Sequence, residues 1–104
     1  MERIAFTMKL KKDCSAEYKR RHDAIWPELS SLLKRTGIEQ YSIFLEDATG
    51  ILFGYLQIED SGLIENLRGE PLMWKWWNYM EDIMETNPDK SPQSTPLQEV
   101  FYLP

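Results

Sequence analysis

The chain has 104 residues, of which 42% are hydrophobic and 28% are charged, and its net charge is −5. A chain of this length forms one small domain, residues 1–104, and cannot divide its apolar residues between two cores. The negative charge argues against nucleic acid and anionic membrane surfaces as partners, because their phosphate groups would be repelled. No apolar run is long enough to span a bilayer, and the first residues are typical of a strand rather than of a signal peptide.

The inventory of reactive residues is small. Cys14 is the only cysteine, so no intrachain disulfide can form, and the cytoplasm is the simplest location. One histidine and one cysteine do not supply a zinc site of the usual spacing. No glycine-rich loop of the kind that holds phosphates or dinucleotides is present. We therefore expect no metal and no cofactor.

Three stretches of the chain have the alternating pattern of strands. Residues 4–10 place apolar side chains at every second position. Residues 38–46 and 51–59 predict a hairpin, whose turn is Asp47-Ala48-Thr49-Gly50. The second of these strands is apolar on both faces, which indicates a sheet that is covered on both sides. Residues 97–103 alternate again and predict a final strand.

Two helical regions lie between these strands. The first extends from Ser15 to Arg35, and Pro27 interrupts it because proline has no N–H and its ring clashes with the preceding turn. The second extends from about Ser61 to Met84, with an interruption at Gly69-Glu70-Pro71. At Pro27, either the helix kinks or a second segment begins.

Polar residues mark the start and the outer side of the first helix. Asp13 or Ser15 can cap its N-terminus. The basic run Lys19-Arg20-Arg21 is followed directly by Asp23, which predicts a solvated helix face.

The order of these elements is βαββαβ, which predicts an α+β, ferredoxin-like fold: four antiparallel strands with the helices on one face. Two helical layers on one side leave the other face of the sheet open. A second copy of the chain would cover this face economically, so we expect a homodimer. The alternative is a peripheral loop that folds over the sheet.

The only histidine of the chain, His22, lies on the apolar face of the first helix. At 3.6 residues per turn, this face spans an arc of roughly 120°. It consists of Tyr18, His22, Ile25, Trp26, Leu29, Leu32 and Leu33. An imidazole titrates near neutral pH and is the best candidate for acid–base chemistry in this chain. The alternative is a core histidine that is satisfied by a backbone carbonyl, and the spacing leaves both open.

Four Trp and five Tyr give the chain an aromatic inventory that suits carbohydrate, because ring faces stack on sugar carbons while hydroxyl and N–H groups bond sugar hydroxyls. The helical spacing places Trp76 at the centre of an apolar stripe, as expected for a core residue, and Trp77 at its edge, as expected for a cleft. Tyr41 lies on the face of its strand that we expect to meet the helices. Together, these features indicate cofactor-free acid–base chemistry on a small, uncharged, hydroxylated ligand.

Several segments resemble the L-rhamnose mutarotases, and the likeness covers essentially the whole chain. It is weakest over Ser61 to Glu70. The segments that carry it are Glu17-Tyr18-Lys19-Arg20-Arg21-His22-Asp23-Ala24-Ile25-Trp26-Pro27-Glu28-Leu29, Trp76-Trp77-Asn78-Tyr79-Met80-Glu81-Asp82-Ile83-Met84, Asn87-Pro88-Asp89-Lys90-Ser91-Pro92 and Leu97-Gln98-Glu99-Val100-Phe101-Tyr102-Leu103-Pro104.

The resemblance implies a dimeric, ferredoxin-like isomerase that interconverts the α and β anomers of L-rhamnose without a metal or a cofactor. By this resemblance, the proton donor is His22, and the residues that contact the substrate are Tyr18, Tyr41, Trp76 and Trp77. Asp23 stands where the family also has Asn, and its carboxylate would raise the pKa of the imidazole slightly.

Two other functions remain open for a small dimeric fold of this kind. One is a haem-binding or quinone-forming monooxygenase, in which His22 would ligate the haem iron. The other is a module that binds a sugar without turnover. Residues 86–96, with three prolines, form a long connection for a small domain, and we expect it to border the cleft or to cross the dimer interface.

Overall fold

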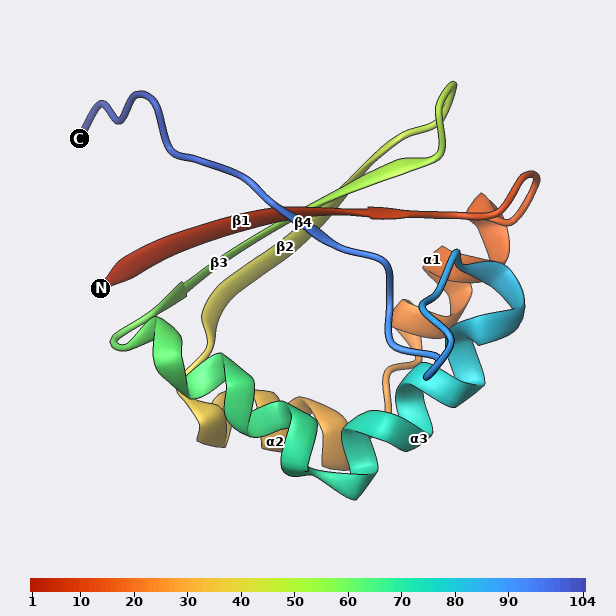
Figure 1. The fold of residues 1–104 in the computed structure, drawn as a ribbon, viewed down its shortest axis with the longest axis horizontal. Helices are drawn as coiled ribbons and strands as arrows, with labels where there is room; N and C mark the ends of the chain where they lie inside the picture. The colour runs from red at the N-terminus through yellow and green to blue at the C-terminus, as the bar shows by residue number, and fades with distance from the viewer.

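The computed structural model describes residues 1–104 and shows a four-stranded sheet with all helices on one of its faces (Figure 1). The strands lie in the order β2-β3-β1-β4, and every neighbouring pair is antiparallel. The fold prediction is therefore confirmed. Along the chain the elements are β1 (Glu2–Lys9), α1 (Ser15–Asp23), α2 (Pro27–Thr36), β2 (Glu39–Glu46), β3 (Ile51–Ile58), the 3₁₀ helix η1 (Ser61–Gly69), α3 (Pro71–Met80), the 3₁₀ turn η2 (Glu81–Ile83) and β4 (Thr95–Pro96).

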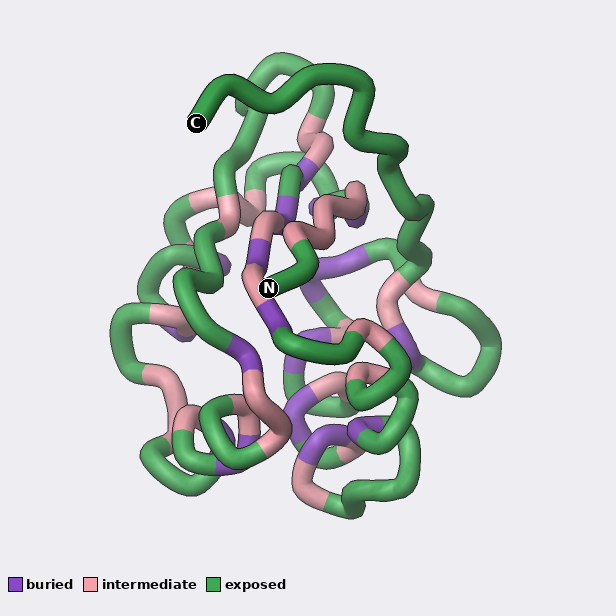
Figure 2. The backbone as a smooth tube through the Cα atoms, turned by 90° about the vertical axis from the view of Figure 1, so that its left-hand side faces the viewer, coloured by how far each residue is buried: buried purple, intermediate pink, exposed green.

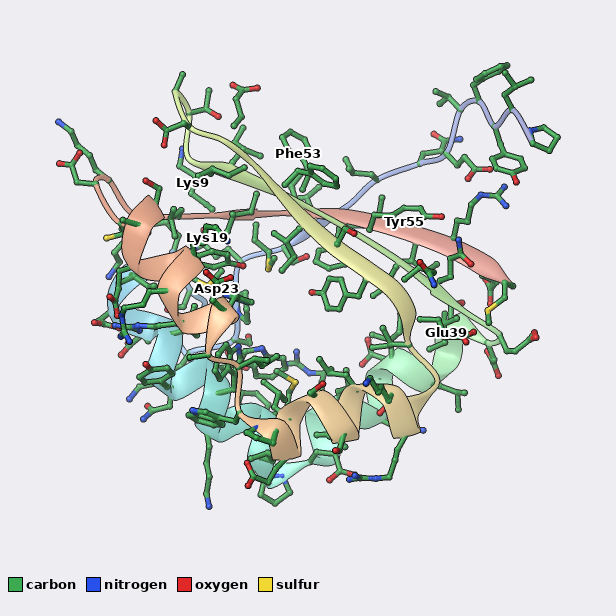
Figure 3. All side chains as sticks on the ribbon, turned by 180° about the vertical axis from the view of Figure 1, so that it is seen from behind. Lys9, Lys19, Asp23, Glu39, Phe53 and Tyr55 are labelled. Atoms are coloured by element: carbon green, nitrogen blue, oxygen red, sulfur yellow. The ribbon has the colours of Figure 1, made fainter.

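The main core lies between the sheet and the helices. Even-numbered residues of β3 face the helices and are buried, whereas Phe53 points to the opposite side (Figures 2 and 3). Burial of each such side chain stabilises the fold by about 1.5–3 kcal/mol. Among the most deeply buried side chains of this layer are Leu29, Leu32, Leu52, Leu56, Ile58 and Met80.

Gly54 of β3 leaves room for the aromatic ring of Phe6, which lies on the neighbouring strand β1. The register pairs Gly54 of β3 with Phe6 of β1. A Cβ atom on Gly54 would lie 2.4 Å from the Phe6 ring, so any side chain there would displace that ring. The Phe6 ring in turn meets Tyr41 edge to face, at 6.3 Å between centroids.

The two prolines divide the helical regions as expected. Pro27 and Pro71 each begin a helix, where the missing N–H costs no hydrogen bond. The prediction of a side-chain cap on α1 was wrong: Cys14 occupies the N-cap position, and no side chain caps the helix. Asp13 instead adopts a left-handed backbone conformation, with φ of 62°, in the turn that leads into α1.

The prediction of a strand over residues 97–103 was also wrong. The fourth strand is the short β4, and the residues after it form no strand. Only the Leu97 N–H continues the pairing, by donating to the Ala5 carbonyl at 2.9 Å. Alternation marks residues that can form a strand, but a strand also needs a neighbour. Here the chain leaves the sheet on the side where β1 begins (Figure 1).

Arg3 ties this C-terminal segment to the sheet. Its guanidinium donates two hydrogen bonds of 2.8 Å to Glu99 and lies 3.5 Å from the ring centroid of Tyr102. The apolar side chains around these contacts remain open, since Val100 is 88% and Phe101 77% exposed.

No helix of the protein is long and apolar enough to cross a membrane.

Candidate active site

A cavity of about 1650 Å³ lies between the helices and the sheet. All five predicted site residues line it: His22, Tyr18, Tyr41, Trp76 and Trp77. They come from α1, β2 and α3, so the fold brings together side chains that are up to 59 positions apart in sequence. A second hollow, of about 560 Å³ beside β4, contains none of them.

His22 is held by its own helix. Its Nδ1 lies 3.1 Å from the carbonyl oxygen of Tyr18, one turn earlier. A carbonyl oxygen only accepts hydrogen bonds, so in the neutral imidazole Nδ1 carries the proton. Nε2 is then left with its lone pair free. This arrangement defines both the tautomer and the orientation of the ring.

Aromatic rings surround this imidazole. The centroid of the Tyr18 ring lies 4.3 Å from that of the imidazole, and the two planes make an angle of 30°. The Trp76 ring lies at a centroid distance of 5.4 Å, with an interplanar angle of 89°. Burial in this environment lowers the pKa of His22 from its ordinary value. The Tyr18 carbonyl and the Asp23 carboxylate both act to raise it, but burial has the larger effect. His22 is therefore neutral at pH 7.

Two tyrosines line the cavity from opposite sides, Tyr18 from the helices and Tyr41 from the sheet. Tyr18 of α1 is only 8% exposed, and no protein group forms a hydrogen bond with its hydroxyl. No buried side-chain nitrogen or oxygen of the protein lacks a partner, so this hydroxyl reaches the water of the cavity. Tyr41 of β2 is 38% exposed, because water enters the cavity that it lines. Burial raises the pKa of Tyr18 above its ordinary value and that of Tyr41 to about 12.

An irregularity in β2 precedes Tyr41. The pairing of β2 with β3 shifts register between Glu39 and Ser42, and Gln40 has a φ of 52°. A bulge of this kind bends the strand and increases its twist. The bend lies directly before Tyr41, whose side chain is on the face of the sheet that meets the helices.

Trp76 and Trp77 form the part of the wall that α3 contributes. Trp76 is 6% exposed and also packs edge to face on Trp26 at 5.0 Å, so it belongs both to the core and to the cavity. Trp77 is half-buried, and Trp74 meets it edge to face at 4.7 Å. The spacing left Trp77 open between core and cleft, and the structure places it in the lining of the cavity.

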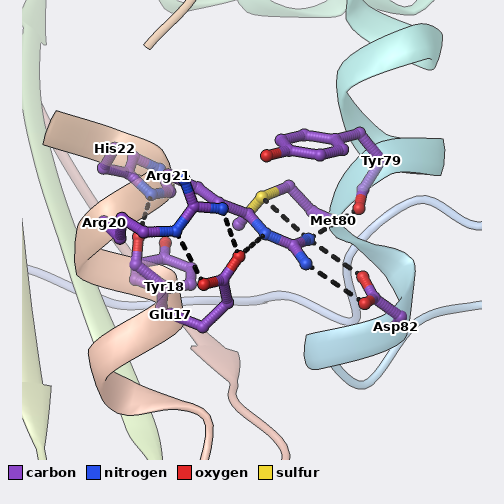
Figure 4. A network of polar contacts seen from close by, with 8 residues as sticks. All are labelled: Glu17, Tyr18, Arg20, Arg21, His22, Tyr79, Met80 and Asp82. Carbon is purple, nitrogen blue, oxygen red and sulfur yellow. Dashed lines mark hydrogen bonds and ion pairs between the residues drawn. The ribbon is translucent and has the colours of Figure 1, made fainter. Parts of the chain in front are cut away.

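Arg21 was misassigned by the prediction of a solvated basic face. Its side chain is only 9% exposed, whereas Lys19 and Arg20, the other two members of the run, are 77% and 63% exposed. Its guanidinium binds Glu17 of its own helix and Asp82 of η2 (Figure 4). The signal in the sequence was its position three residues after Tyr18, at the edge of the buried stripe.

The loop of residues 86–96 borders the cavity, as expected. Ser91, Pro92, Ser94 and Pro96 line it. Ser91 is 2% exposed and donates a hydrogen bond of 2.5 Å to Asp89, which lowers the pKa of that carboxyl group. Asp89 also pairs with Arg68 of η1 at 3.3 Å, so the loop is attached to the helical layer.

No group of three or more His, Cys, Asp or Glu side chains is arranged to hold a metal ion. Around His22, the cavity offers one neutral imidazole with a free nitrogen, two protonated phenols and two indole rings. These groups can exchange protons with an uncharged ligand and stack on its apolar side.

Comparisons with known proteins agree with this chemistry. The family model for L-rhamnose mutarotase matches residues 3–103. An L-rhamnose mutarotase of Flavobacterium johnsoniae is 56% identical over 97% of this chain and 94% of its own, and one of Enterococcus faecalis is 52% identical over 99% and 100%. The crystal structure of an L-rhamnose mutarotase from Formosa agariphila superposes with a TM-score of 0.93 at 46% identity, covering all of both chains.

These findings do not support the haem-binding, monooxygenase or non-catalytic alternatives. They agree instead with the α+β fold, with the aromatic cavity and with its single histidine. A match over residues 3–103 leaves almost none of the chain outside the likeness. The chain belongs to the L-rhamnose mutarotase family.

Proposed function

We propose that this protein interconverts the α and β anomers of L-rhamnose, as an isomerase of L-rhamnose metabolism, and that His22 is its acid–base residue. The observation that carries this proposal is the His22 imidazole, which faces an aromatic cavity with its Nδ1 proton bound to the Tyr18 carbonyl. Mutarotation needs only proton transfers, and it proceeds slowly in water without a catalyst. A positioned acid–base group typically accelerates such a step by about 10²- to 10⁴-fold.

The proton transfers follow from the tautomer. Nε2 of neutral His22 removes the proton from the anomeric hydroxyl, the C1–O1 bond becomes a carbonyl, and the bond between C1 and the ring oxygen breaks. A hydroxyl of the cavity gives its proton to the ring oxygen. After rotation about C1–C2, the same transfers run in reverse on the other face of the carbonyl, and His22 returns its proton to O1.

The tyrosines are the donors in this scheme. Tyr18 is one helical turn from His22, and Tyr41 faces the same cavity from the sheet. Because burial raises the pKa of both hydroxyls, both carry their protons at neutral pH. Trp76 and Trp77 offer ring faces for the apolar side of the sugar, which carries the C6 methyl group.

The activity is tested by saturation-transfer NMR on equilibrated L-rhamnose. Addition of the protein is expected to transfer saturation between the two anomeric protons faster than in buffer alone. Tight binding of the sugar without faster exchange would identify a binding module and would refute the proposed activity.

The pH dependence of exchange follows from the shifted pKa values. Burial lowers the pKa of His22 from its ordinary value. Therefore kcat/KM should fall only in acid, as the pH drops through the lowered pKa and the base becomes protonated. No second fall is expected near pH 10, because the tyrosine hydroxyls keep their protons there. The measurement is the NMR exchange rate from pH 4 to 10, corrected for exchange in buffer. An acid limb centred above 7 would contradict the assignment of His22.

We also propose a homodimer that forms through the open face of the sheet. Phe53 points away from the helices on this face and is 37% exposed (Figure 3). Phe44 is its partner on the neighbouring strand and is 67% exposed. The C-terminal segment, whose Val100 and Phe101 are exposed, extends on this side of the sheet (Figure 1). Apolar surface of this extent on a small domain is typical of an interface.

Half-buried Cys14 as a free thiol is compatible with the cytoplasm, where we place this single domain.

The dimer is tested by changing charge on this face. The double variant Phe44→Lys, Phe53→Lys is expected to sediment as a monomer, since buried like charges oppose association. Leu63→Lys is the matched control, because Leu63 is an exposed apolar residue of η1 on the helical side, at 36%. Sedimentation of the unaltered protein as a monomer at micromolar concentration would refute the proposal.

A further inference from the structure

We propose that Arg21 is a positioning residue, which holds the helix that carries the base against the helix that carries the tryptophans. This inference rests on the proposed role of His22. Arg21 directly precedes His22 in α1, and its side chain extends from α1 to the end of α3 and to η2 (Figure 4). It is the most buried charged side chain of the protein, at 9% exposure.

The guanidinium of Arg21 makes contacts in two directions. Toward its own helix, Nε donates to Glu17 at 2.7 Å. Toward the other, Nη1 donates to the Tyr79 carbonyl at 2.7 Å, and Nη1 and Nη2 bind the two oxygens of Asp82 at 2.9 and 3.1 Å. Hydrogen bonds from Arg20 and Arg21 together lower the pKa of Glu17 to about 2, and the bonds from Arg21 hold the pKa of Asp82 below its ordinary value. The cation therefore joins three elements at one point.

The contact with Tyr79 completes the end of α3. The last carbonyls of a helix have no partner within it, and a cation there also interacts favourably with the helix dipole. The last turn of α3 contains no basic residue of its own. Arg21 supplies both the hydrogen bond and the charge from α1, so the end of α3 depends on the other helix.

A short series of ring contacts leads from this point to the base. The Arg21 guanidinium lies 4.5 Å from the Tyr79 ring centroid. Tyr79 packs on Trp76 at 5.6 Å, and Trp76 meets His22 at 5.4 Å. A displacement of α3 relative to α1 would change the last of these distances, and with it the placement of a sugar between indole and imidazole.

The planar guanidinium is required because its donors point in fixed directions. Nη1 and Nη2 bind Asp82 through two hydrogen bonds, while Nε still reaches Glu17. A lysine ammonium has the same charge but cannot span these partners together. Charge alone should therefore not replace Arg21.

The test compares Arg21→Met with Arg20→Met in the full-length protein. Arg20 is the matched control: it binds the same Glu17, is 63% exposed, and outside α1 reaches only the side chain of Tyr79. We expect kcat for anomer exchange to fall by about 10- to 100-fold in Arg21→Met, because a displaced base misses the reacting oxygen. KM should change little, since the aromatic wall that holds the sugar remains, and Arg20→Met should keep the activity of the parent.

Two further readouts separate positioning from stability. Millimolar guanidinium chloride should restore kcat in Arg21→Ala by occupying the vacated site, and it should have no such effect on Arg20→Ala. The NOE between the His22 imidazole and the Trp76 indole, which needs no activity, should weaken in Arg21→Met. If Arg21→Met does not fold, Asp82→Asn removes one partner at an exposed position and should lower kcat in the same direction.

The possible failures are distinguishable. Absence of exchange by the unaltered protein would refute the proposed function, whereas the NOE would still report on the position of α3. An active parent protein and a folded Arg21→Met with unchanged kcat and an unchanged NOE would overturn the role of Arg21 alone. Equal losses of kcat in Arg21→Met and Arg20→Met would do the same.

Discussion

Replacement of His22 by alanine is expected to slow enzyme-dependent exchange of the rhamnose anomers by about 10²- to 10⁴-fold. The reason is that the rings around His22 cannot replace it as a base: the tyrosines are protonated at pH 7, and the tryptophans have no basic nitrogen. Saturation-transfer NMR on L-rhamnose measures the loss directly. His22→Gln is a useful companion, because an amide keeps hydrogen bonding but cannot accept a proton at this pH.

The fold of the His22 variants should survive. His22 forms one hydrogen bond, to the Tyr18 carbonyl of its own helix, and it carries no buried charge at pH 7. Circular dichroism and thermal unfolding check this point. A folded His22→Ala protein with the exchange rate of its parent would remove His22 from the mechanism and would direct attention to the two tyrosines.

Replacement of Trp76 by alanine is expected to lower both stability and activity. The ring is 6% exposed and contacts Trp26, Tyr79 and His22, so its removal leaves a large void in the core. A change of this kind typically costs about 3–5 kcal/mol in the free energy of unfolding. Urea unfolding measures this cost, and NMR exchange below the midpoint measures the loss of the wall that contacts the sugar.

Trp74→Ala is the matched control for this variant. Trp74 lies on the same helix, but it packs on Trp77 and donates its indole N–H to the Arg68 carbonyl at 2.7 Å, outside the contacts of His22. It should lose clearly less stability and keep most of its activity. Equal losses in the two variants would show that the tryptophan-bearing helix tolerates no truncation, and that Trp76 has no special place in the site.

Much of the fold follows from local rules that the sequence displays. Proline cannot donate the hydrogen bond that a helix interior requires, so Pro27 and Pro71 mark the starts of α2 and α3. Alternation fixes which side of β1 faces the helices, whereas β3 is apolar on both faces and takes its side from its pairing with β1. The site was also predictable in outline, since His22 and Tyr18 are one turn apart in one helix. Their relation to Tyr41 and Trp76 depends on tertiary packing, and it came from the family resemblance.

The failures have physical causes of the same kind. Residues 97–103 alternate as a strand does, but the pattern does not reveal whether another strand lies beside them. The run Lys19-Arg20-Arg21 looks uniform in sequence, yet helix geometry turns only its last member toward α3. Whether an arginine there is solvated or buried depends on a carboxylate 61 positions away, Asp82, and no local pattern contains that information.

The size of the cavity has a consequence for how sugars are told apart. At about 1650 Å³ it has more room than one pyranose fills, so water can share it with a bound sugar. The contacts of the sugar with the rings around His22 then matter more for its selection than enclosure by the walls.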